Sequence, residues 1–259
     1  MSLFSIFYYL VLSFIYILAI PYLIFKSRNS KYRQAIPAKF FLKDNVPFKE
    51  NGIWFHSCSM GETKAIKPLI ENYLENANIS VITNTGFEEA KKISPNVRYL
   101  PFEIFLPFWV NKQKVLVVME AELWYLLFLF AKKKGAKTLL INARISDKSY
   151  KSYKRFSFFY KRIFQNIDKV FAQSEVDKLR LEELGASNVE VIGNIKLAQL
   201  PKVNIELEKP KQVVITAAST HENEEKLILD AYKKEQGKLI IVPRHPERFE
   251  KVHLQILEF

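Results

Sequence analysis

The chain has 259 residues, a formal net charge of +12 and a pI near 9.5, so it is long enough to bury a core and to hold more than one domain. The positive charge attracts anionic partners, but nucleic acid, anionic lipid and phosphorylated substrates fit it equally well. The one cysteine, Cys58, excludes an internal disulfide, and the four histidines add no ligand set with zinc spacing. We therefore expect neither a metal nor a cofactor.

The N-terminal segment is apolar. Residues 2–25 contain no charged side chain, and about twenty such residues suffice for a helix that crosses a bilayer. Basic residues follow from Lys26 onward, which places the rest of the protein on the cytoplasmic side. Pro21 interrupts the run and leaves open a helix that lies in the membrane interface. We predict a membrane anchor over residues 1–26, either single-pass or monotopic.

After Gly52, short apolar runs alternate with amphipathic stretches, a pattern typical of βα repeats and a parallel sheet. We predict strands at 53–57, 79–83, 97–100, 114–119, 138–141, 169–172 and 189–192. We predict helices at 63–77, 122–133, 147–166 and 175–184, with Gly135 and Gly185 at two helix ends. These elements form an α/β domain over residues 27–200.

The pattern breaks after Leu200, where Pro201 and Pro210 bound a segment without periodicity. We interpret residues 201–210 as an interdomain linker. A second βα series follows, with strands at 213–217 and 238–242 and helices at 222–234 and from Pro246 onward. About 50 residues follow the linker, whereas a domain has on the order of 100. We therefore expect the second domain, 211–259, to be incomplete.

One junction carries the first candidate site residue. Ser59 and Glu62 follow the strand 53–57 at the spacing of a capping box, and Gly61 keeps the turn between them open. In open α/β sheets, ligands bind outside the carboxyl ends of the strands. Glu62 is thus either a helix cap or an active-site carboxylate, and the spacing alone leaves both interpretations open.

Polar residues also follow most of the other predicted strands. They are Asn84, Thr85, Glu120, Glu122, Asn142, Arg144, Gln173, Ser174, Asn194, Lys196, Ser219, Thr220, His221, Arg244 and His245. Taken one at a time, most of these residues can be explained as helix caps or polar loop residues. Together they offer acids, amides and cations around one crevice, which suits an anionic, hydroxyl-rich substrate.

Arg244 is the best candidate for phosphate binding. Its planar guanidinium can bind two phosphoryl oxygens, and Pro246 suits the first turn of a helix whose N–H groups face the ligand. The sequence has no Walker loop and no Gly-x-Gly-x-x-Gly, which argues against kinase, ATPase and dinucleotide functions.

The predicted helix 147–166 alternates lysines and arginines with aromatic residues. Three interpretations are open: contact with anionic lipid headgroups, an RNA-binding face, or a solvated helix with an aromatic core stripe. We favour the core stripe for at least half of these residues.

With these residues in place, the chain resembles the Kdo transferases, which add 3-deoxy-D-manno-octulosonic acid (Kdo) to the lipid A precursor. The resemblance covers the whole chain. Its motifs, in chain order, are His56–Glu62, Met119–Trp124, Asn142–Ser146, Ala172–Asp177, Gly193–Lys196, Ser219–Glu222 and Pro243–Phe249.

The resemblance implies a GT-B fold of two Rossmann-like domains, the first for the acceptor and the second for the donor. It implies metal-independent, inverting transfer from CMP-Kdo to the lipid A precursor (lipid IVA) at the cytoplasmic side of the cell inner membrane, in lipopolysaccharide core biosynthesis. Carried over by residue, Glu62 is the general base, and Glu120 and Lys196 support the transition state. The donor site comprises Pro243 and Arg244, to which we add Ser219, Thr220 and His221.

The sequence departs from the family at three points. Met60 replaces a small aliphatic residue, Tyr125 replaces a proline, and the strands and loops that complete the CMP site in the family do not follow residue 259. The alternative interpretation is a non-catalytic, membrane-associated fragment that binds lipid without holding the donor. A nucleic-acid binder rests on charge alone, so we expect membrane lipids and no nucleic acid as partners.

Overall fold

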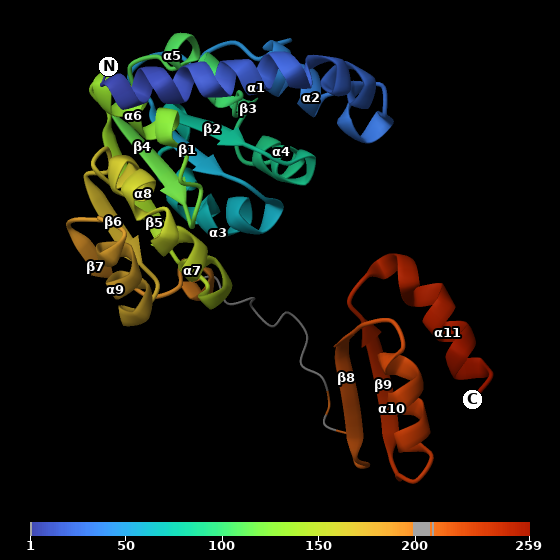
Figure 1. Ribbon diagram of the computed structural model, residues 1–259. Helices are drawn as coiled ribbons and strands as arrows, with labels where there is room; N and C mark the ends of the chain where they lie inside the picture. The colour runs from blue at the N-terminus through green and yellow to red at the C-terminus, as the bar shows by residue number, and fades with distance from the viewer. Residues whose placement is uncertain (1, 199–207, 209) are drawn as a thin grey trace. The chain divides into compact units, whose positions relative to one another are not determined.

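The computed structural model describes residues 2–198, 208 and 210–259. It divides the chain into two compact units, Met1–Leu200 and Pro201–Phe259 (Figure 1). Most of the predicted linker, residues 201–207 and 209, lies outside the described residues. The acceptor and donor roles of the two domains stay predictions.

The first unit contains a sheet of seven parallel strands. They are β1 (Ile53–Ser57), β2 (Ala77–Val81), β3 (Val97–Tyr99), β4 (Val115–Met119), β5 (Lys137–Ala143), β6 (Lys169–Ala172) and β7 (Val189–Val191). Their order across the sheet is β3-β2-β1-β4-β5-β6-β7, which begins with the Rossmann order 3-2-1-4-5-6. The predicted α/β class is confirmed. The strand order reverses between β1 and β4, and the carboxyl ends of these two strands therefore flank the position where such sheets bind ligands.

Helices cover both faces of this sheet because successive strand residues point to opposite sides. Trp54 packs into one hydrophobic cluster, and the next residue, Phe55, packs into the other. The first cluster includes side chains of α5 (Leu106–Trp109), α6 (Tyr125–Lys133), α8 (Ser157–Phe164) and α9 (Glu175–Glu183). The second includes side chains of α2 (Ala35–Phe41), α3 (Met60–Glu71) and α4 (Asn84–Lys91).

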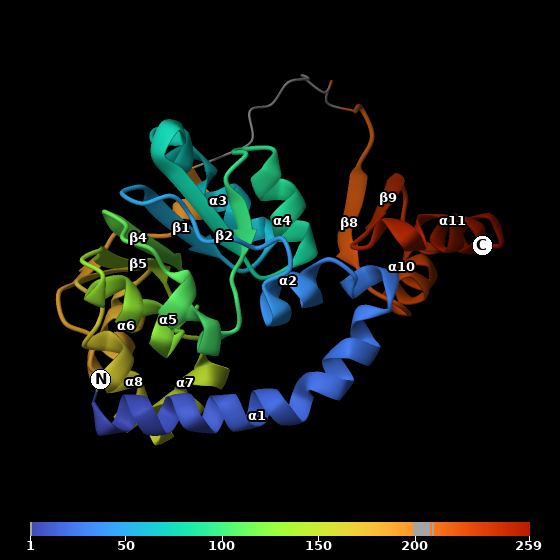
Figure 2. The same ribbon diagram turned by 90° about the horizontal axis from the view of Figure 1, so that it is seen from above.

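The N-terminal helix α1 (Leu3–Ser27) lies along the side of the first unit (Figure 2). Among the described residues it is the one helix that is long and apolar enough to cross a membrane. One face contacts the unit: the Ser5 and Tyr125 hydroxyls are 2.7 Å apart, and the Tyr8 hydroxyl donates to Glu103 at 2.6 Å. Tyr16 donates to the Phe40 carbonyl nearer the other end. The outward face exposes large apolar side chains, including Phe7, Leu10, Phe14, Ile17 and Leu18.

The second unit contains two parallel strands, β8 (Val214–Thr220) and β9 (Lys238–Pro243), with α10 (Glu224–Tyr232) and α11 (Phe249–Leu257). Leu229 and Val252 are buried between these elements. Arg248 also ties the unit together, because it pairs at 2.9 Å with Glu225, whose side chain is 1% exposed.

Several element boundaries differ from the sequence prediction. The helix predicted at 63–77 begins at Met60, because Ser59 caps it, and ends at Glu71. The strand predicted at 79–83 is shifted two residues earlier, to Ala77–Val81. Two short helices, α2 and α4, were not predicted, since each spans only about two turns and shows little periodicity.

The helix predicted at 147–166 is in fact two helices, α7 (Asp147–Arg155) and α8. They meet at Phe156, which leaves the helical conformation. Most of the aromatic residues pack against the first core cluster, as the stripe interpretation requires: Tyr150, Tyr153, Phe159, Tyr160 and Phe164.

Candidate active site

Glu62 lies at the carboxyl end of β1 and caps the helix α3. Its carboxylate accepts hydrogen bonds from the Cys58 N–H at 2.7 Å and from the Ser59 hydroxyl at 3.2 Å, while its own N–H donates to Ser59 Oγ. The capping interpretation of Glu62 is therefore correct. The cap does not exclude a chemical role, because it holds the carboxylate in one place at the point where the strand order reverses.

The surroundings of Glu62 raise the pKa of its carboxyl group. Burial raises the pKa of its carboxyl group, the Cys58 N–H opposes that rise, and the negative charges of Glu120 and Glu122 add to it. A carboxylate with a raised pKa is a stronger base than an exposed glutamate, which is the property a general base needs.

Glu120 and Lys196 form an ion pair at the carboxyl end of β4. Lys196 Nζ lies 2.6 Å from Glu120 Oε1, and the Asn142 amide donates to the same oxygen at 3.3 Å. Asn142 is fully buried, and its own side-chain oxygen accepts from the Ile195 N–H, which fixes the segment that carries Lys196. Glu120 and Asn142 both have φ of 53°, in the left-handed region that non-glycine residues rarely adopt. This conformation is strained for Glu120, whereas asparagine adopts it more readily.

A second carboxylate, Glu122, is held by a buried histidine and an indole. Trp124 Nε1 donates to Glu122 at 2.7 Å, and His56 Nε2 lies 3.8 Å from the same oxygen. Burial acts against ionisation, but His56, Trp124 and the Cys58 side chain together outweigh it and lower the pKa of Glu122. Among the described residues, His56 Nε2 has no hydrogen-bond partner, although the imidazole is fully buried. Glu122 thus stays ionised beside Glu62.

The other imidazole nitrogen fixes the orientation of His56. Nδ1 lies 2.8 Å from Ser80 Oγ, which itself accepts from Trp54 Nε1–H at 2.8 Å. Nδ1 also lies 3.1 Å from the Ser80 carbonyl oxygen, so one residue of the neighbouring strand holds the ring through two contacts. The sequence identified Glu122 as a polar residue after a strand and as part of the motif Met119–Trp124, without a chemical role. The sequence assigned no role to His56 beyond its place in the motif His56–Glu62, because burial cannot be deduced from one residue.

Open space adjoins Glu120. A cavity of about 250 Å³ is lined by Glu120, Arg144, Ser146, Ser149 and Tyr153. It offers one cation and several hydroxyl groups beside the ion pair, which suits an anionic, hydroxyl-rich ligand. Among the described residues, no three His, Cys, Asp or Glu side chains gather in a way that could hold a metal ion.

The second unit brings together the five residues predicted to bind the donor. Ser219 and Thr220 end β8, and Pro243 ends the neighbouring β9, with Thr220 and Pro243 paired in the sheet. His221 and Arg244 directly follow these strands. Arg244 donates its N–H to the Thr220 carbonyl and keeps its side chain exposed.

Two of these residues have structural tasks. Thr220 is buried, and its hydroxyl bonds to Glu225 at 2.8 Å. Ser219 has φ of 62°, which turns the chain at the strand end. Ser219, His221 and Arg244 are therefore the members of this group with side chains free to meet a ligand.

Comparison with known proteins shows which family the chain is similar to. Residues 28–199 match the family model described as 3-deoxy-D-manno-octulosonic-acid transferase (kdotransferase). The chain is 35% identical to a bifunctional glycosyltransferase/methyltransferase of Fusobacterium nucleatum, over 81% of this chain and 37% of that protein. It is 35% identical to the 3-deoxy-D-manno-octulosonic acid transferase of Rickettsia felis, over 77% of this chain and 48% of that protein.

Two further matches have lower sequence identity. The chain is 29% identical to the 3-deoxy-D-manno-octulosonic acid transferase of Chlamydia pneumoniae, over 96% of this chain and 64% of that protein. A crystal structure of a glycosyltransferase from Rickettsia africae superposes with a TM-score of 0.44 at 16% identity, over 82% of this chain and 66% of that one. The chain spans about half the length of the curated relatives it matches. Because the family model covers most of the chain, this protein belongs to the 3-deoxy-D-manno-octulosonic-acid transferase family.

Proposed function

We propose that this chain transfers Kdo from CMP-Kdo to a lipid A precursor, with inversion and with Glu62 as the general base. The observation that carries the proposal is the position of Glu62. Its carboxylate is fixed at the ligand-binding edge of a Rossmann-type sheet, and burial raises its pKa.

Each charged group then has a chemical task. Glu62 removes the proton of the acceptor hydroxyl as the oxygen attacks the anomeric carbon, and the bond to the CMP phosphate breaks. Lys196, oriented by Glu120, offers positive charge to the negative charge that develops during transfer. Arg244, with Ser219 and His221, binds the phosphate and sugar of CMP.

The membrane location is also a proposal, and α1 supports it. The helix is attached to the first unit at Ser5, Tyr8 and Tyr16, while its outward face exposes large apolar side chains. A helix that is bonded to the folded unit between Ser5 and Tyr16 cannot also cross the bilayer without losing these bonds. We therefore place α1 in the plane of the interface, with the first unit on the cytoplasmic face of the inner membrane.

The test must distinguish the role of Glu62 as a general base from its role in capping the helix α3. Glu62→Gln keeps an oxygen that accepts from the Cys58 N–H, but it cannot take a proton from the acceptor. Ser59→Ala removes the helix cap and leaves the carboxylate, at a stability cost of about 1 kcal/mol. The assay follows the mass of a lipid A precursor incubated with CMP-Kdo and the chain in detergent.

We expect the mass increment of Kdo with the natural chain and with Ser59→Ala, and none with Glu62→Gln. Turnover by Glu62→Gln at the natural rate would sink the assigned role of Glu62. If the natural chain gives no increment, a titration with CMP decides between two causes. Binding of CMP by the folded chain points to inactive assay conditions. No binding favours the alternative, a membrane-associated protein that lacks a donor site.

A further inference from the structure

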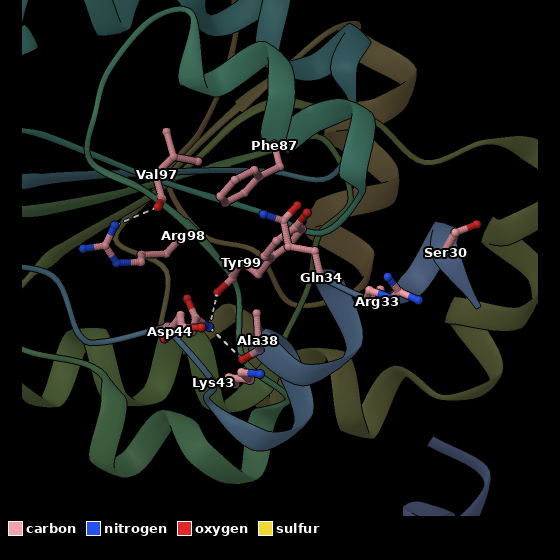
Figure 3. Close-up of a pocket in the computed structure, with 11 residues that line it drawn as sticks. Ser30, Arg33, Gln34, Ala38, Lys43, Asp44, Phe87, Val97, Arg98 and Tyr99 are labelled. Carbon is pink, nitrogen blue, oxygen red and sulfur yellow. Dashed lines mark hydrogen bonds between the residues drawn. The ribbon is translucent and has the colours of Figure 1, made fainter. Parts of the chain in front are cut away.

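A separate hollow lies in the first unit, between α2 and the β3 edge of the sheet (Figure 3). Its volume is about 450 Å³. The walls come from three places: α2 with the turns on either side of it, the helix α4, and the strand β3. The first wall residue, Ser30, follows the end of α1 by three positions. This hollow has no part in the proposed transfer.

Positive charge predominates in the hollow. Arg33, Lys43 and Arg98 line it, against one carboxylate, Asp44. Arg98 is held in place, since its guanidinium donates to the carbonyls of Val46 and Val97. Within the described residues, the side chains of Arg33 and Lys43 have neither an ion-pair nor a hydrogen-bond partner. These two cations are therefore available to an anionic ligand.

The hollow is built by buried contacts. The amide of Asn45, 2% exposed, donates to the carbonyls of Ala38 and Tyr99 at 2.9 Å each, and so joins the turn to α2 and β3. The Phe87 and Tyr99 rings stack on each other with centroids 4.2 Å apart and planes 6° apart, and they line one wall while staying 8% and 2% exposed. Its shape is thus set before any ligand arrives.

The turn that carries Lys43 is strained. Leu42 and Asp44 have φ of 55° and 53°, the left-handed region, which costs a non-glycine residue about 1 kcal/mol or more. Lys43 lies between them, and the strain sets the path of the chain where this cation enters the hollow. Backbone strain of this kind persists where the surroundings enforce it, often at ligand-binding sites.

We propose that this hollow binds the phosphate group of a membrane lipid. Arg33 and Lys43 supply charge-assisted hydrogen bonds to the phosphate, and basic segments next to a membrane-associated helix bind anionic headgroups. The small exposed part of the Phe87 and Tyr99 rings can touch the segment of the lipid that joins the phosphate to the acyl chains. The proposal needs no glycosyl transfer, so its test is independent of the proposed enzymatic activity.

The test uses a lipid that remains soluble, which removes general attraction to a charged membrane. The full chain in a nonionic detergent is titrated by calorimetry with a short-chain phosphatidate. We expect saturable binding of one lipid per chain. The double variant Arg33→Gln/Lys43→Gln should weaken binding by about tenfold or more.

The matched control is Arg28→Gln/Lys31→Gln, which removes two charges from the same basic segment but outside the hollow. We expect it to change the affinity by less than about threefold, because surface charges contribute little at this range. Equal weakening in both double variants, or no saturable binding to the natural chain, would overturn the proposal.

Two further titrants identify the source of the phosphate. Short-chain phosphatidylcholine carries no net charge, and it should bind at least about tenfold more weakly than the phosphatidate. Inorganic phosphate lacks the apolar part, and it should compete only at much higher concentration. Competition by inorganic phosphate at concentrations similar to those of the lipid would mean that the ligand is a free phosphate, and it would overturn the lipid assignment.

Discussion

Lys196 Nζ lies 2.6 Å from Glu120 Oε1, although 76 residues separate the two in the sequence. The side chains are 45% and 22% exposed. Ion pairs with this much solvent access contribute about 0–1 kcal/mol to stability. The pair therefore sets the position of the Lys196 side chain and contributes little to the stability of the fold.

Replacing Lys196 by alanine should reduce turnover by about 10²–10³-fold, the typical loss when one electrostatic group is removed from a transition state. The thermal unfolding midpoint should stay close to that of the natural chain. Lys154→Ala is the control, since it breaks a comparable surface pair with Glu183 at 2.8 Å, outside the candidate site. Equal turnover in the two variants would show that Lys196 has no part in the reaction.

Much of the fold follows from the sequence because apolar runs in a parallel sheet are buried on both faces. The strands at 53–57 and 169–172 have the predicted bounds, and Gly135 and Gly185 end their helices with φ of 90° and 99°. Such signals are local. The strand order is not local, and the position of the site between β1 and β4 could not be read from the periodicity.

The candidate site was predictable in its residue types but not in its contacts. The position of Glu62 after a strand was visible in the sequence, and so was its capping partner. The buried hydrogen-bonded chain from Trp54 through Ser80 to His56 was not visible in the sequence. It joins the neighbouring strands β1 and β2, and each of its residues, taken alone, resembles an ordinary core residue.

The reactivity of the Cys58 thiol depends on the electrostatics of the site, and measuring it needs no assay of glycosyl transfer. Burial, followed by the charges of Glu122 and Glu62, raises the pKa of this thiol to about 12. At pH 8 the thiolate fraction is then on the order of 10⁻⁴, and iodoacetamide should react at least about 100-fold more slowly than with an exposed cysteine. Cys58 is the only cysteine in the sequence, so the mass of the alkylated chain gives the rate directly.

Glu122→Gln should speed this alkylation, because removing a nearby negative charge lowers the pKa of the thiol. Glu75→Gln is the matched control on an exposed glutamate. An unchanged rate in Glu122→Gln would contradict the placement of that carboxylate beside Cys58.

Glu103 should make the stability of the first unit depend on pH. Burial raises its pKa to about 7, although hydrogen bonds from Tyr8 and from the Leu126 N–H oppose the rise. An unfolded glutamate has a pKa of about 4.3, so between these two values the folded state binds the proton and the unfolded state does not. The stabilising contribution is therefore greatest below about pH 4.3 and is lost as pH rises to 7, by at most about 1.4 kcal/mol per pH unit.

The test compares thermal unfolding of the natural chain and Glu103→Gln from pH 5 to pH 8. The glutamine can accept from the Leu126 N–H and donate to the Tyr8 hydroxyl, so it keeps both contacts without titrating. Tryptophan fluorescence suits the measurement, because all three tryptophans lie in the first unit. The natural chain should lose stability relative to the variant as pH rises, and parallel curves would exclude titration of Glu103 in this range.

The contacts of α1 predict that both of its ends lie on one side of the membrane. Ser5 and Tyr8 bond to the first unit near the start of the helix, and Tyr16 does so further along. A spanning helix of 25 residues would instead carry its start about 37 Å away, across the bilayer. In a Cys58→Ser background, Ser2→Cys and Arg28→Cys should react equally with a membrane-impermeant maleimide from the cytoplasmic side of sealed vesicles. Reaction of Ser2→Cys only from the opposite side would show that α1 leaves the first unit and crosses the membrane.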